Sequence, residues 1–495
     1  MRGLVVSFTS PTFLFLFLPV VLAVYWVCRW RRPRDLFLLV ASLIFYAWGE
    51  GPVVGLLLGS IVANYALGLM LEQPRLGRWR VWAIAAAVMI NLTPLLLMKY
   101  AGFVLVNANR MLAFVGGTPF IVPNWHVPAG ISFFTFMALT YVLAIHRQEI
   151  AAQRDPLKLG LFIALFPTIM AGPILRYHDL AHQLADRVLT RESGAEGARR
   201  FVYGLAKKAL IADTLAGPAN MVFSLGLQDL STGVAWLGLG CFTLQIFFDF
   251  SGYSDMAIGL GRMLGFRFAE NFDHPYTALS LRAFWTRWHI SLSSWFRDYV
   301  FLRVAYPVGR ALEGWGSTRL QDQGAYVAAT LVTMLLIGLW HGASWTFVAW
   351  GLYNGLVLAV ERTRVGKRIG RLPRPVQHIY TMFVVMIGWT IFRASSARQA
   401  ARYLAALVGL GGSSALPVTT YGGFDVVLAL LAGVLLSTRF GGLTGTWLRV
   451  RVQRAGTIGS AFLTLGEIVV VMGLLIASLS WLSAGTFTPF IYFRF

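Results

Sequence analysis

The stretch Ala325-Tyr-Val-Ala-Ala-Thr-Leu-Val-Thr-Met-Leu-Leu-Ile-Gly-Leu-Trp-His341 decides the fold. From Ala325 to Val360 the chain has no Asp, Glu, Lys or Arg, and its one histidine is His341. A helix needs about 20 mostly apolar residues to cross a bilayer, so this stretch predicts a transmembrane helix. A side chain that can be protonated is costly at membrane depth and by default marks a functional site.

Apolar runs recur outward from this stretch to both ends of the chain. Of 495 residues, 57% are hydrophobic and 13% are charged, whereas a soluble domain has about 25% charged residues. Because lipid offers the backbone no hydrogen-bond partners, these runs must be helical. They predict an all-α polytopic membrane protein with about 11 to 13 transmembrane helices. The candidate spans are residues 11–28, 36–49, 52–71, 81–98, 99–115, 128–146, 157–173, 202–225, 232–250, 325–341, 344–361, 376–393, 422–437 and 462–482.

Three stretches do not fit simple spanning helices. Residues 166–173 contain two prolines and a glycine, which predicts a broken or re-entrant helix lining a cavity enclosed by protein. Residues 264–300 form the longest polar interruption of the central region, and residues 395–420 are typical of a loop with an interfacial helix.

The basic residues give the predicted orientation. The formal net charge is +21, and basic clusters such as Arg29–Arg34 and Arg75–Arg80 lie between apolar runs. Such clusters are typical of cytoplasmic loops that contact anionic membrane lipid, and they place the N-terminus in the periplasm or exterior. We therefore do not interpret the charge as nucleic-acid binding. The two cysteines provide neither a disulfide framework nor a metal site.

Residues 281–299 have the pattern of one amphipathic helix. Large apolar residues recur at intervals of four and three, and polar residues recur on another face. The apolar set is Leu281, Trp285, Trp288, Leu292, Trp295 and Tyr299, and the polar set is Arg282, Thr286, His289, Ser293 and Arg297. One interpretation is an interfacial helix with its tryptophans at the lipid headgroups. The other is a helix whose polar face, with His289, lines a reaction chamber.

His341 has two possible roles. Histidine can accept and return a proton near neutral pH, which suits general base catalysis. Alternatively, it is a structural histidine that is hydrogen-bonded between helices. Gly338 and Gly342 have the small-xxx-small spacing that permits close approach of helices.

Residues 247–255 place Asp249 and Asp255 six residues apart, with Tyr253 between them. Paired carboxylates can carry acid–base chemistry or bind a cation. A helix that begins near Gly252 and is capped by Asp249 and Ser251 is the stronger explanation of the pattern. We interpret these three residues as structural or tunnel-lining, and we predict no metal ligands.

These motifs resemble the membrane-bound O-acyltransferase family, specifically its bacterial alginate O-acetylase branch. The resemblance rests on Trp285-Thr-Arg-Trp-His-Ile-Ser-Leu-Ser-Ser-Trp-Phe-Arg-Asp-Tyr299 and Gly338-Leu-Trp-His-Gly342. Supporting segments are residues 247–261, 130–136, 171–173 and 489–495. The resemblance implies a single transmembrane domain over residues 1–495, with a catalytic core at about 128–361 and C-terminal helices over 376–495.

The resemblance also implies a ring of helices around a central tunnel, with His341 as the catalytic histidine and His289 as the second one. Residues assigned to substrate binding are Arg282, Arg297, Trp340 and Ser293. No bound cofactor is implied. Acetyl-CoA is the implied acyl donor, and periplasmic acetyltransferase proteins and a polysaccharide acceptor are the implied partners. The implied location is the bacterial inner membrane, crossed many times.

The acceptor stays open between alginate, cellulose, another exopolysaccharide and peptidoglycan. After Tyr299 the chain has Phe301-Leu-Arg-Val-Ala-Tyr-Pro-Val-Gly-Arg310 where the branch has a Gly-Gly-Asn-Arg type of loop. Two alternative functions also remain. One is D-alanyl transfer to teichoic acid on the same fold, and the other is a transporter or flippase without covalent chemistry, although no inverted repeat is visible.

Overall fold

The computed structural model describes residues 7–314, 316–413, 417–439, 456–485 and 490–491. Within these ranges every regular element is helical, and none is a strand. Several of the helices are long and apolar enough to cross a bilayer. The prediction of an all-α polytopic membrane protein is therefore confirmed.

The chain divides into two compact units. The first contains residues 1–201 and 254–269, and the second contains residues 202–253 and 270–495. Helices α10 (Arg191–Ala206) and α12 (Thr232–Met263) contribute to both units. The single domain over residues 1–495, its core at about 128–361 and the ring around a tunnel stay predictions.

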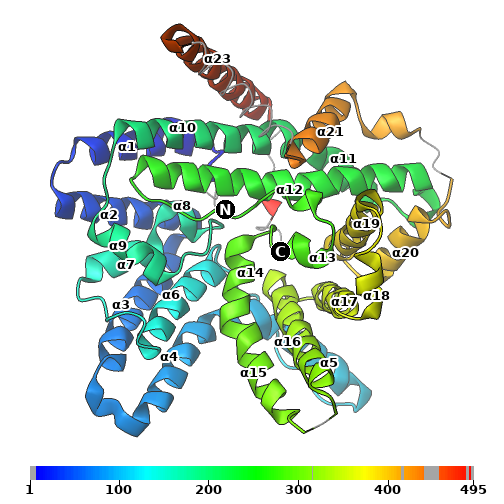
Figure 1. Ribbon diagram of the computed structural model, residues 1–495, viewed down its shortest axis with the longest axis horizontal. Coiled ribbons are helices and arrows are strands. Elements are labelled where there is room, and N and C mark those ends of the chain that lie inside the picture. Colours follow the sequence, from blue (N-terminus) through cyan, green and yellow to red (C-terminus); the bar gives the residue numbers. More distant parts are fainter. Residues whose placement is uncertain (1–6, 315, 414–416, 440–455, 486–489, 492–495) are drawn as a thin grey trace. The chain divides into compact units, whose positions relative to one another are not determined.

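The first unit is built mainly from apolar helices around buried phenylalanines such as Phe13, Phe45 and Phe166. Helices α2 and α3 run in different directions in Figure 1, because Gly51 between them has a φ of 57°. The elements are η1 (Phe13–Phe17), α1 (Leu18–Val27), α2 (Arg31–Glu50), η2 (Gly51–Val53), α3 (Val54–Leu71), η3 (Pro74–Trp79), α4 (Arg80–Leu95), η4 (Leu96–Tyr100), α5 (Ala101–Phe114), α6 (Ile131–His146), α7 (Pro156–Ala164), α8 (Phe166–Ile169) and α9 (Tyr177–Ala185).

The helix predicted to break at residues 166–173 does break. Helix α7 ends at Ala164, α8 is a four-residue turn, and the chain is not helical again before Tyr177. Pro167 and Pro173 have no N–H to donate, which shortens the helical ladder. Whether the segment is re-entrant and lines a cavity stays a prediction.

The second unit contains the central and C-terminal helices. They are η5 (Lys207–Ala212), α11 (Asp213–Ser224), η6 (Leu227–Asp229), η7 (Pro275–Thr277), α13 (Leu281–Trp285), α14 (Ile290–Phe296), η8 (Arg297–Phe301), α15 (Leu302–Ala311), α16 (Thr318–His341), α17 (Trp345–Glu361), α18 (Arg364–Ile369), α19 (Arg374–Arg393), α20 (Ala397–Leu407), η9 (Val418–Tyr421), α21 (Phe424–Ser437) and α23 (Gly456–Ser483). Helix α20 lies within the stretch 395–420, where a loop with an interfacial helix is predicted.

Helix α12 runs without interruption through the aspartates at 249 and 255. The expectation of a helix that begins near Gly252 is therefore wrong. The glycine serves close packing instead, since a Cβ there would lie 2.7 Å from the carbonyl oxygen of Gly204. A side chain at position 252 would push α12 away from the end of α10.

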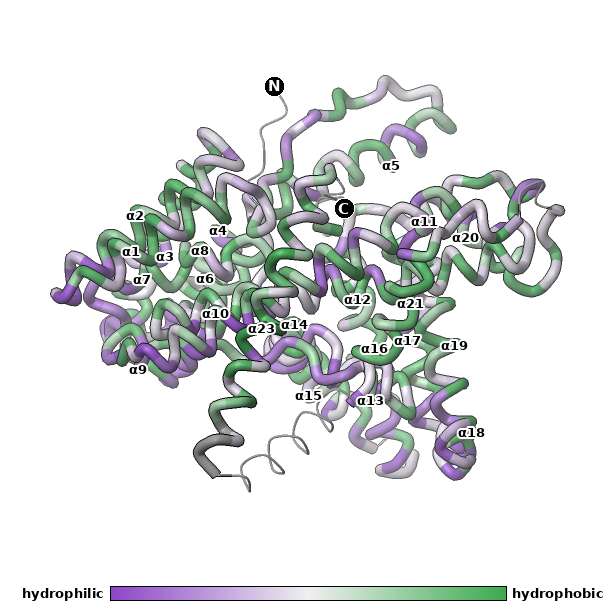
Figure 2. Tube along the Cα trace, turned by 90° about the horizontal axis from the view of Figure 1, so that it is seen from above, coloured by the Kyte–Doolittle hydropathy of each residue, from purple (hydrophilic) through white to green (hydrophobic). Residues whose placement is uncertain are grey.

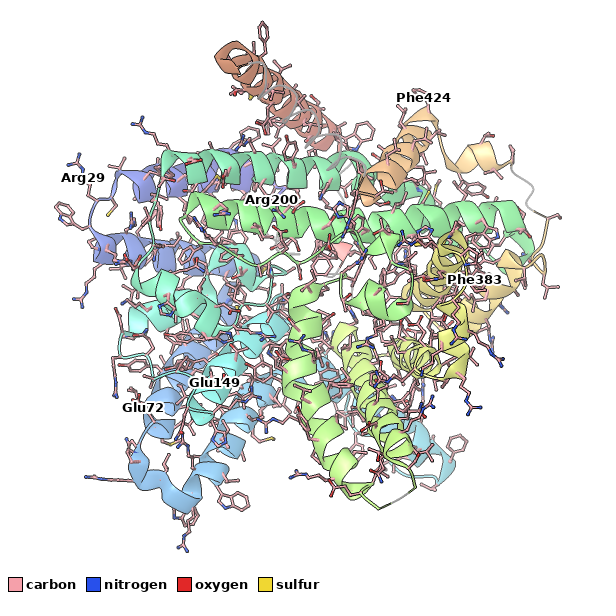
Figure 3. All side chains as sticks on the ribbon, in the orientation of Figure 1. Arg29, Glu72, Glu149, Arg200, Phe383 and Phe424 are labelled. Carbon is pink, nitrogen blue, oxygen red and sulfur yellow. The ribbon has the colours of Figure 1, made fainter. Side chains whose placement is uncertain are left out.

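Apolar side chains remain exposed on helices that have the length of a membrane span. Six stretches of the described chain are long and apolar enough to cross a bilayer: Arg31–Leu71, Pro74–Phe114, Thr232–Met263, Thr318–His341, Arg374–Arg393 and Ala461–Ser483. Phe383 of α19, labelled in Figure 3, is among the exposed side chains. Figure 2 shows green hydrophobic residues along α2, α3 and α19. The number of 11 to 13 spans stays a prediction.

Helices α16 and α17 form a tightly packed hairpin (Figure 1). A Cβ at Gly338 would overlap the carbonyl oxygen of Phe347, and a Cβ at Gly351 would overlap that of Met334. Only glycine fits at both places. The close helix approach predicted from Gly338 is therefore confirmed, and it fixes the end of α16, where His341 lies.

Candidate active site

His289 lies at a break between two helices. Helix α13 ends at Trp285, α14 begins at Ile290, and His289 has the left-handed values φ 44° and ψ 57°. The prediction of one helix over residues 281–299 is therefore wrong. A neighbouring loop takes over the backbone hydrogen bonds there: Ile290 N–H donates to the Asn271 carbonyl at 2.9 Å, and Asp273 N–H donates to the Arg287 carbonyl at 3.0 Å.

The break separates the residues predicted to share one polar face, because the helical register does not continue through His289. It also changes the role of the tryptophans. Trp288 is 1% exposed and packs 4.9 Å from the Trp389 ring and 5.1 Å from the Phe272 ring. Trp295 is buried as well. The interpretation of these side chains as a headgroup belt is therefore wrong, because they form part of the protein core.

The side-chain oxygen of Asn271 organises the start of α14. It accepts hydrogen bonds from Ser291 N–H at 3.1 Å and from the Ser291 hydroxyl at 3.0 Å. It also contacts Nδ1 of His289 at 3.1 Å. Asn271 is buried, and its pattern in the sequence gives no sign of this role. The contact depends on a loop folding back from residues 18 to 20 positions away.

The His289 ring is enclosed by aromatic side chains. Phe250 meets it edge-on at 4.6 Å, and Trp340 lies 5.9 Å away. Nε2 of His289 is buried and has no hydrogen-bond partner among the described residues. Because burial penalises the charged form, it lowers the pKa of His289 to about 3. The imidazole is therefore neutral at physiological pH.

His341 ends α16 and is buried. Its ring meets Phe392 at 4.9 Å and Trp350 at 5.2 Å, both nearly perpendicular. The chain leaves the helix here because Gly342 is extended and Ser344 starts α17, accepting a hydrogen bond from Phe347 N–H. His341 is thus held inside protein at the hairpin turn and does not face lipid.

Trp340 brings the two predicted catalytic residues together. Its ring lies 4.7 Å from the His341 ring and 5.9 Å from the His289 ring. Two imidazoles from segments about fifty residues apart in sequence therefore share one tryptophan. Imidazoles that pack near a buried aromatic ring can handle protons and hydrogen bonds away from bulk water.

The other residues predicted to bind substrate have different surroundings. Arg297 is exposed and pairs with its neighbour Asp298 at 2.7 Å. The Ser293 hydroxyl donates to the Trp288 carbonyl at 3.3 Å. Neither contact places the side chain against His289. Their substrate-binding roles stay predictions.

Arg282 lines a cavity of about 270 Å³ at the start of α13. Arg362, which stacks over the Tyr326 ring at 4.7 Å, lines the same cavity. Glu361 also borders it, but its carboxylate accepts hydrogen bonds from the backbone N–H groups of Leu281 and Arg282. Figure 2 shows the adjoining α18 as strongly hydrophilic. The cavity can therefore attract an anion.

Asp249 belongs to a buried charge cluster in the second unit. Lys208 Nζ lies 2.8 Å from its carboxylate and 2.6 Å from that of Asp213. The second oxygen of Asp249 accepts a hydrogen bond from Ile491 N–H at 2.7 Å. The partner residues could not be predicted, since they lie up to 242 positions away in sequence.

Tyr253 and Asp255 make separate contacts. The Tyr253 ring stacks on Phe490 at 4.8 Å, and Phe490 also packs against Phe250 at 5.7 Å. Asp255 belongs to the first unit and pairs with Arg200 at 2.6 Å; Arg200 is labelled on α10 in Figure 3. Among the described residues, no three His, Cys, Asp or Glu side chains lie close enough to hold a metal ion.

Comparison with known proteins matches the chain to one acyltransferase family and to relatives that are named as acyl-group transferases. The membrane-bound O-acyltransferase family matches residues 120–386. The chain is 38% identical to the probable alginate O-acetylase of Pseudomonas putida, over 99% of this chain and 100% of that protein. It is 32% identical to the peptidoglycan O-acetyltransferase of Helicobacter pylori, over 84% of this chain and 82% of that protein. It is 30% identical to the teichoic acid D-alanyltransferase of Bacillus subtilis, over 46% of this chain and 57% of that protein.

Proposed function

The chain belongs to the membrane-bound O-acyltransferase family, and from this premise we propose that it O-acetylates an extracytoplasmic polysaccharide such as alginate. The observation that carries the proposal is the match to a probable alginate O-acetylase over the full length of both proteins. A second O-acetyltransferase, which acts on peptidoglycan by its name, matches over most of its length. Acetyl is therefore favoured as the transferred group.

The two imidazoles around Trp340 supply the chemistry. An acceptor hydroxyl must lose its proton as its oxygen attacks the acyl carbonyl, and a positioned base contributes about 10²–10⁴-fold to such a step. In the proposal His341 takes this proton. The C–O ester bond forms, the C–S bond of the thioester breaks, and the proton passes to the leaving sulfur. His289 is the second site residue and orients a substrate.

Acetyl-CoA is the proposed donor. Its phosphates suit the cavity beside α13, where Arg282 and Arg362 are both exposed. Guanidinium groups bind phosphate through paired hydrogen bonds. Helix α13 leads from this cavity to Trp285, whose ring lies 5.5 Å from Trp350, and Trp350 in turn contacts His341. These ring contacts connect the cavity with His341, and they support a donor site on the side of Arg282 and Arg362.

The remaining assignments follow the same premise. We propose that the protein lies in the bacterial inner membrane, with its N-terminus in the periplasm. It acts with periplasmic acetyltransferase proteins that complete transfer to the polymer. The basic loops between apolar runs support this orientation. Arg297, Ser293 and Trp340 are proposed to contact the substrate.

D-alanyl transfer to teichoic acid is the second candidate. The match to a D-alanyltransferase, although partial, supports it. The two functions differ in their donors. Inverted membrane vesicles that contain the protein are supplied either with labelled acetyl-CoA or with a labelled D-alanyl carrier protein. We expect incorporation of acetyl only, and we expect the His341→Gln variant to lose it at an unchanged protein level.

Incorporation of D-alanine only would replace acetyl by D-alanyl transfer. If neither label is incorporated although cells with the protein still export polymer, the result would support a transporter without covalent chemistry. The His378→Gln variant is a matched control, since His378 is on α19 and its Nε2 contacts the Tyr276 carbonyl at 2.7 Å. It is expected to keep acetyl incorporation near the wild-type level.

A further inference from the structure

The atom of Asn271 that faces His289 can be identified as oxygen. Ser291 N–H can only donate a hydrogen bond, and it points at this atom from 3.1 Å. The NH₂ group of the amide cannot accept, so the side-chain oxygen must be the atom at this position. The same oxygen is 3.1 Å from Nδ1 of His289.

The proton on the His289 ring follows from this assignment. A carbonyl oxygen has no hydrogen to give, so Nδ1 of His289 must carry the hydrogen of this contact. A neutral imidazole has one N–H, and therefore Nε2 carries a lone pair. That nitrogen is buried and has no hydrogen-bond partner among the described residues. A buried polar atom of this kind is costly unless a ligand completes it.

The backbone also holds His289 in place at a cost. His289 has a φ of 44°, which is uncommon for a residue with a Cβ. Asn271 stabilises this strained backbone conformation, because its carbonyl and side-chain oxygens both accept hydrogen bonds from the first residues of α14. Asn271 thus sets the orientation of the ring as well as its proton.

We infer that Asn271 is a positioning residue that fixes His289 in the Nδ1–H tautomer, so that Nε2 accepts a hydrogen bond from an O–H or N–H of the substrate. The inference rests on the proposed acyl transfer, because that function supplies the substrate. In this tautomer His289 does not donate from Nε2 to a developing oxyanion. Its role is to orient an acceptor hydroxyl or an amide N–H of the donor.

The tautomer can be measured directly by ¹⁵N NMR of the protein labelled at histidine, in lipid bilayers at pH 7. The His289 signals are assigned by their loss in the His289→Gln variant. We expect Nδ1 protonated and Nε2 bare in the wild type. Asn271→Leu removes the accepting oxygen at similar size, so a large part of the signal shifts to the Nε2–H tautomer. Asn271→Asp keeps an accepting oxygen and keeps the Nδ1–H tautomer.

Acetyl transfer gives the matching functional result. Asn271→Leu is expected to lose about 10-fold or more in kcat/KM, the size of one oriented hydrogen bond, and Asn271→Asp is expected to recover most of it. A rise in KM for the acetyl donor assigns Nε2 to that substrate, and a rise in KM for the acceptor assigns it to the acceptor hydroxyl. Asn64→Ala is the control, because Asn64 is a buried amide in the first unit paired with Asn91.

Two results overturn the inference: a wild-type His289 protonated at Nε2, or an Asn271→Leu protein whose His289 tautomer is unchanged. If Asn271→Leu does not fold, the wild-type spectrum still decides. Absence of acetyl transfer by the wild type would refute the proposed function, but it would leave the tautomer measurement valid.

Discussion

At the scale of single residues, the two histidines differ in how well the sequence reveals them. His341 is the one histidine of a long apolar run that has no Asp, Glu, Lys or Arg, and this isolation identifies it without any structure. The role of Asn271 could not be predicted in the same way. It depends on a loop whose backbone replaces helical hydrogen bonds around His289, and no local pattern encodes that contact.

The buried His289 predicts that the stability of the folded protein is sensitive to acid. Its pKa is lowered from 6.5 to about 3 by burial. Between these pH values the unfolded chain binds a proton that the folded protein excludes, so stability falls as pH falls from about 6.5 toward 3. The thermal unfolding midpoint in detergent should drop less between pH 7 and pH 5 for His289→Gln than for the wild type. An equal drop in both proteins would contradict the burial of a neutral imidazole.

The buried charges at Lys208 give a second residue-scale prediction. Lys208 lies between Asp213 and Asp249, and all three side chains are almost fully buried. Lys208→Met removes the cation that lies between two buried carboxylates, and removal of one partner from a buried pair costs about 3–5 kcal/mol. Thermal unfolding should show a large loss of stability. The triple variant with Asp213→Asn and Asp249→Asn should recover much of it.

The matched control for this prediction is Arg200→Gln. Arg200 also pairs with an aspartate of α12, but its side chain is 34% exposed. Pairs that water reaches contribute about 0–1 kcal/mol. If Arg200→Gln and Lys208→Met destabilised the protein equally, the burial of the Lys208 cluster would not explain its importance.

At the scale of elements, helical positions follow well from the sequence, and helix breaks follow only where proline signals them. The predicted span 325–341 falls inside α16, and 462–482 falls inside α23. The break after Ala164 was signalled by Pro167 and Pro173. The break at His289 has neither proline nor glycine, because tertiary hydrogen bonds from residues 271–273 create it.

The α16–α17 hairpin provides the element-scale prediction. Gly338→Ala places a methyl group against the Phe347 carbonyl, which belongs to a backbone that cannot rotate away. The helices must separate, and His341 moves with the end of α16. We expect lower stability and a strong loss of acetyl transfer.

Gly240→Ala is the control for the hairpin. Gly240 lies inside α12, and a Cβ there meets no atom within 4 Å. Alanine in an open helical position favours the helix by up to about 1 kcal/mol. This variant should keep wild-type activity and equal or higher stability. Wild-type behaviour of Gly338→Ala would show that close packing does not position His341.

At the scale of the whole molecule, the alternation of apolar runs and basic loops sufficed to predict a polytopic helical membrane protein. The pairing of distant segments did not follow from it. Phe490 and Ile491 pack against α12 through Tyr253, Phe250 and Asp249, more than two hundred residues earlier in the chain. Hydropathy identifies spans, but it carries no information about which polar atoms meet.

The C-terminal contact gives the prediction at this scale. Ile491→Pro removes the one backbone N–H that Asp249 accepts there. The Asp249 carboxylate keeps its ion pair with Lys208 but loses this hydrogen bond. Phe490 is then held less firmly beside Phe250, whose ring contacts His289. Acetyl transfer should fall further than in Ile491→Ala, which retains the N–H. Equal activity of the two variants would argue against the contact.

The most direct measurement of the central claim is the acetyl content of the polymer exported by cells with wild-type protein, with His341→Gln, or with His378→Gln, at matched protein levels. General base catalysis by His341 predicts a loss of acetylation of about 10²-fold or more in the first variant. The second variant should stay near the wild type. Normal acetylation in cells that carry only the His341→Gln protein would contradict the mechanism.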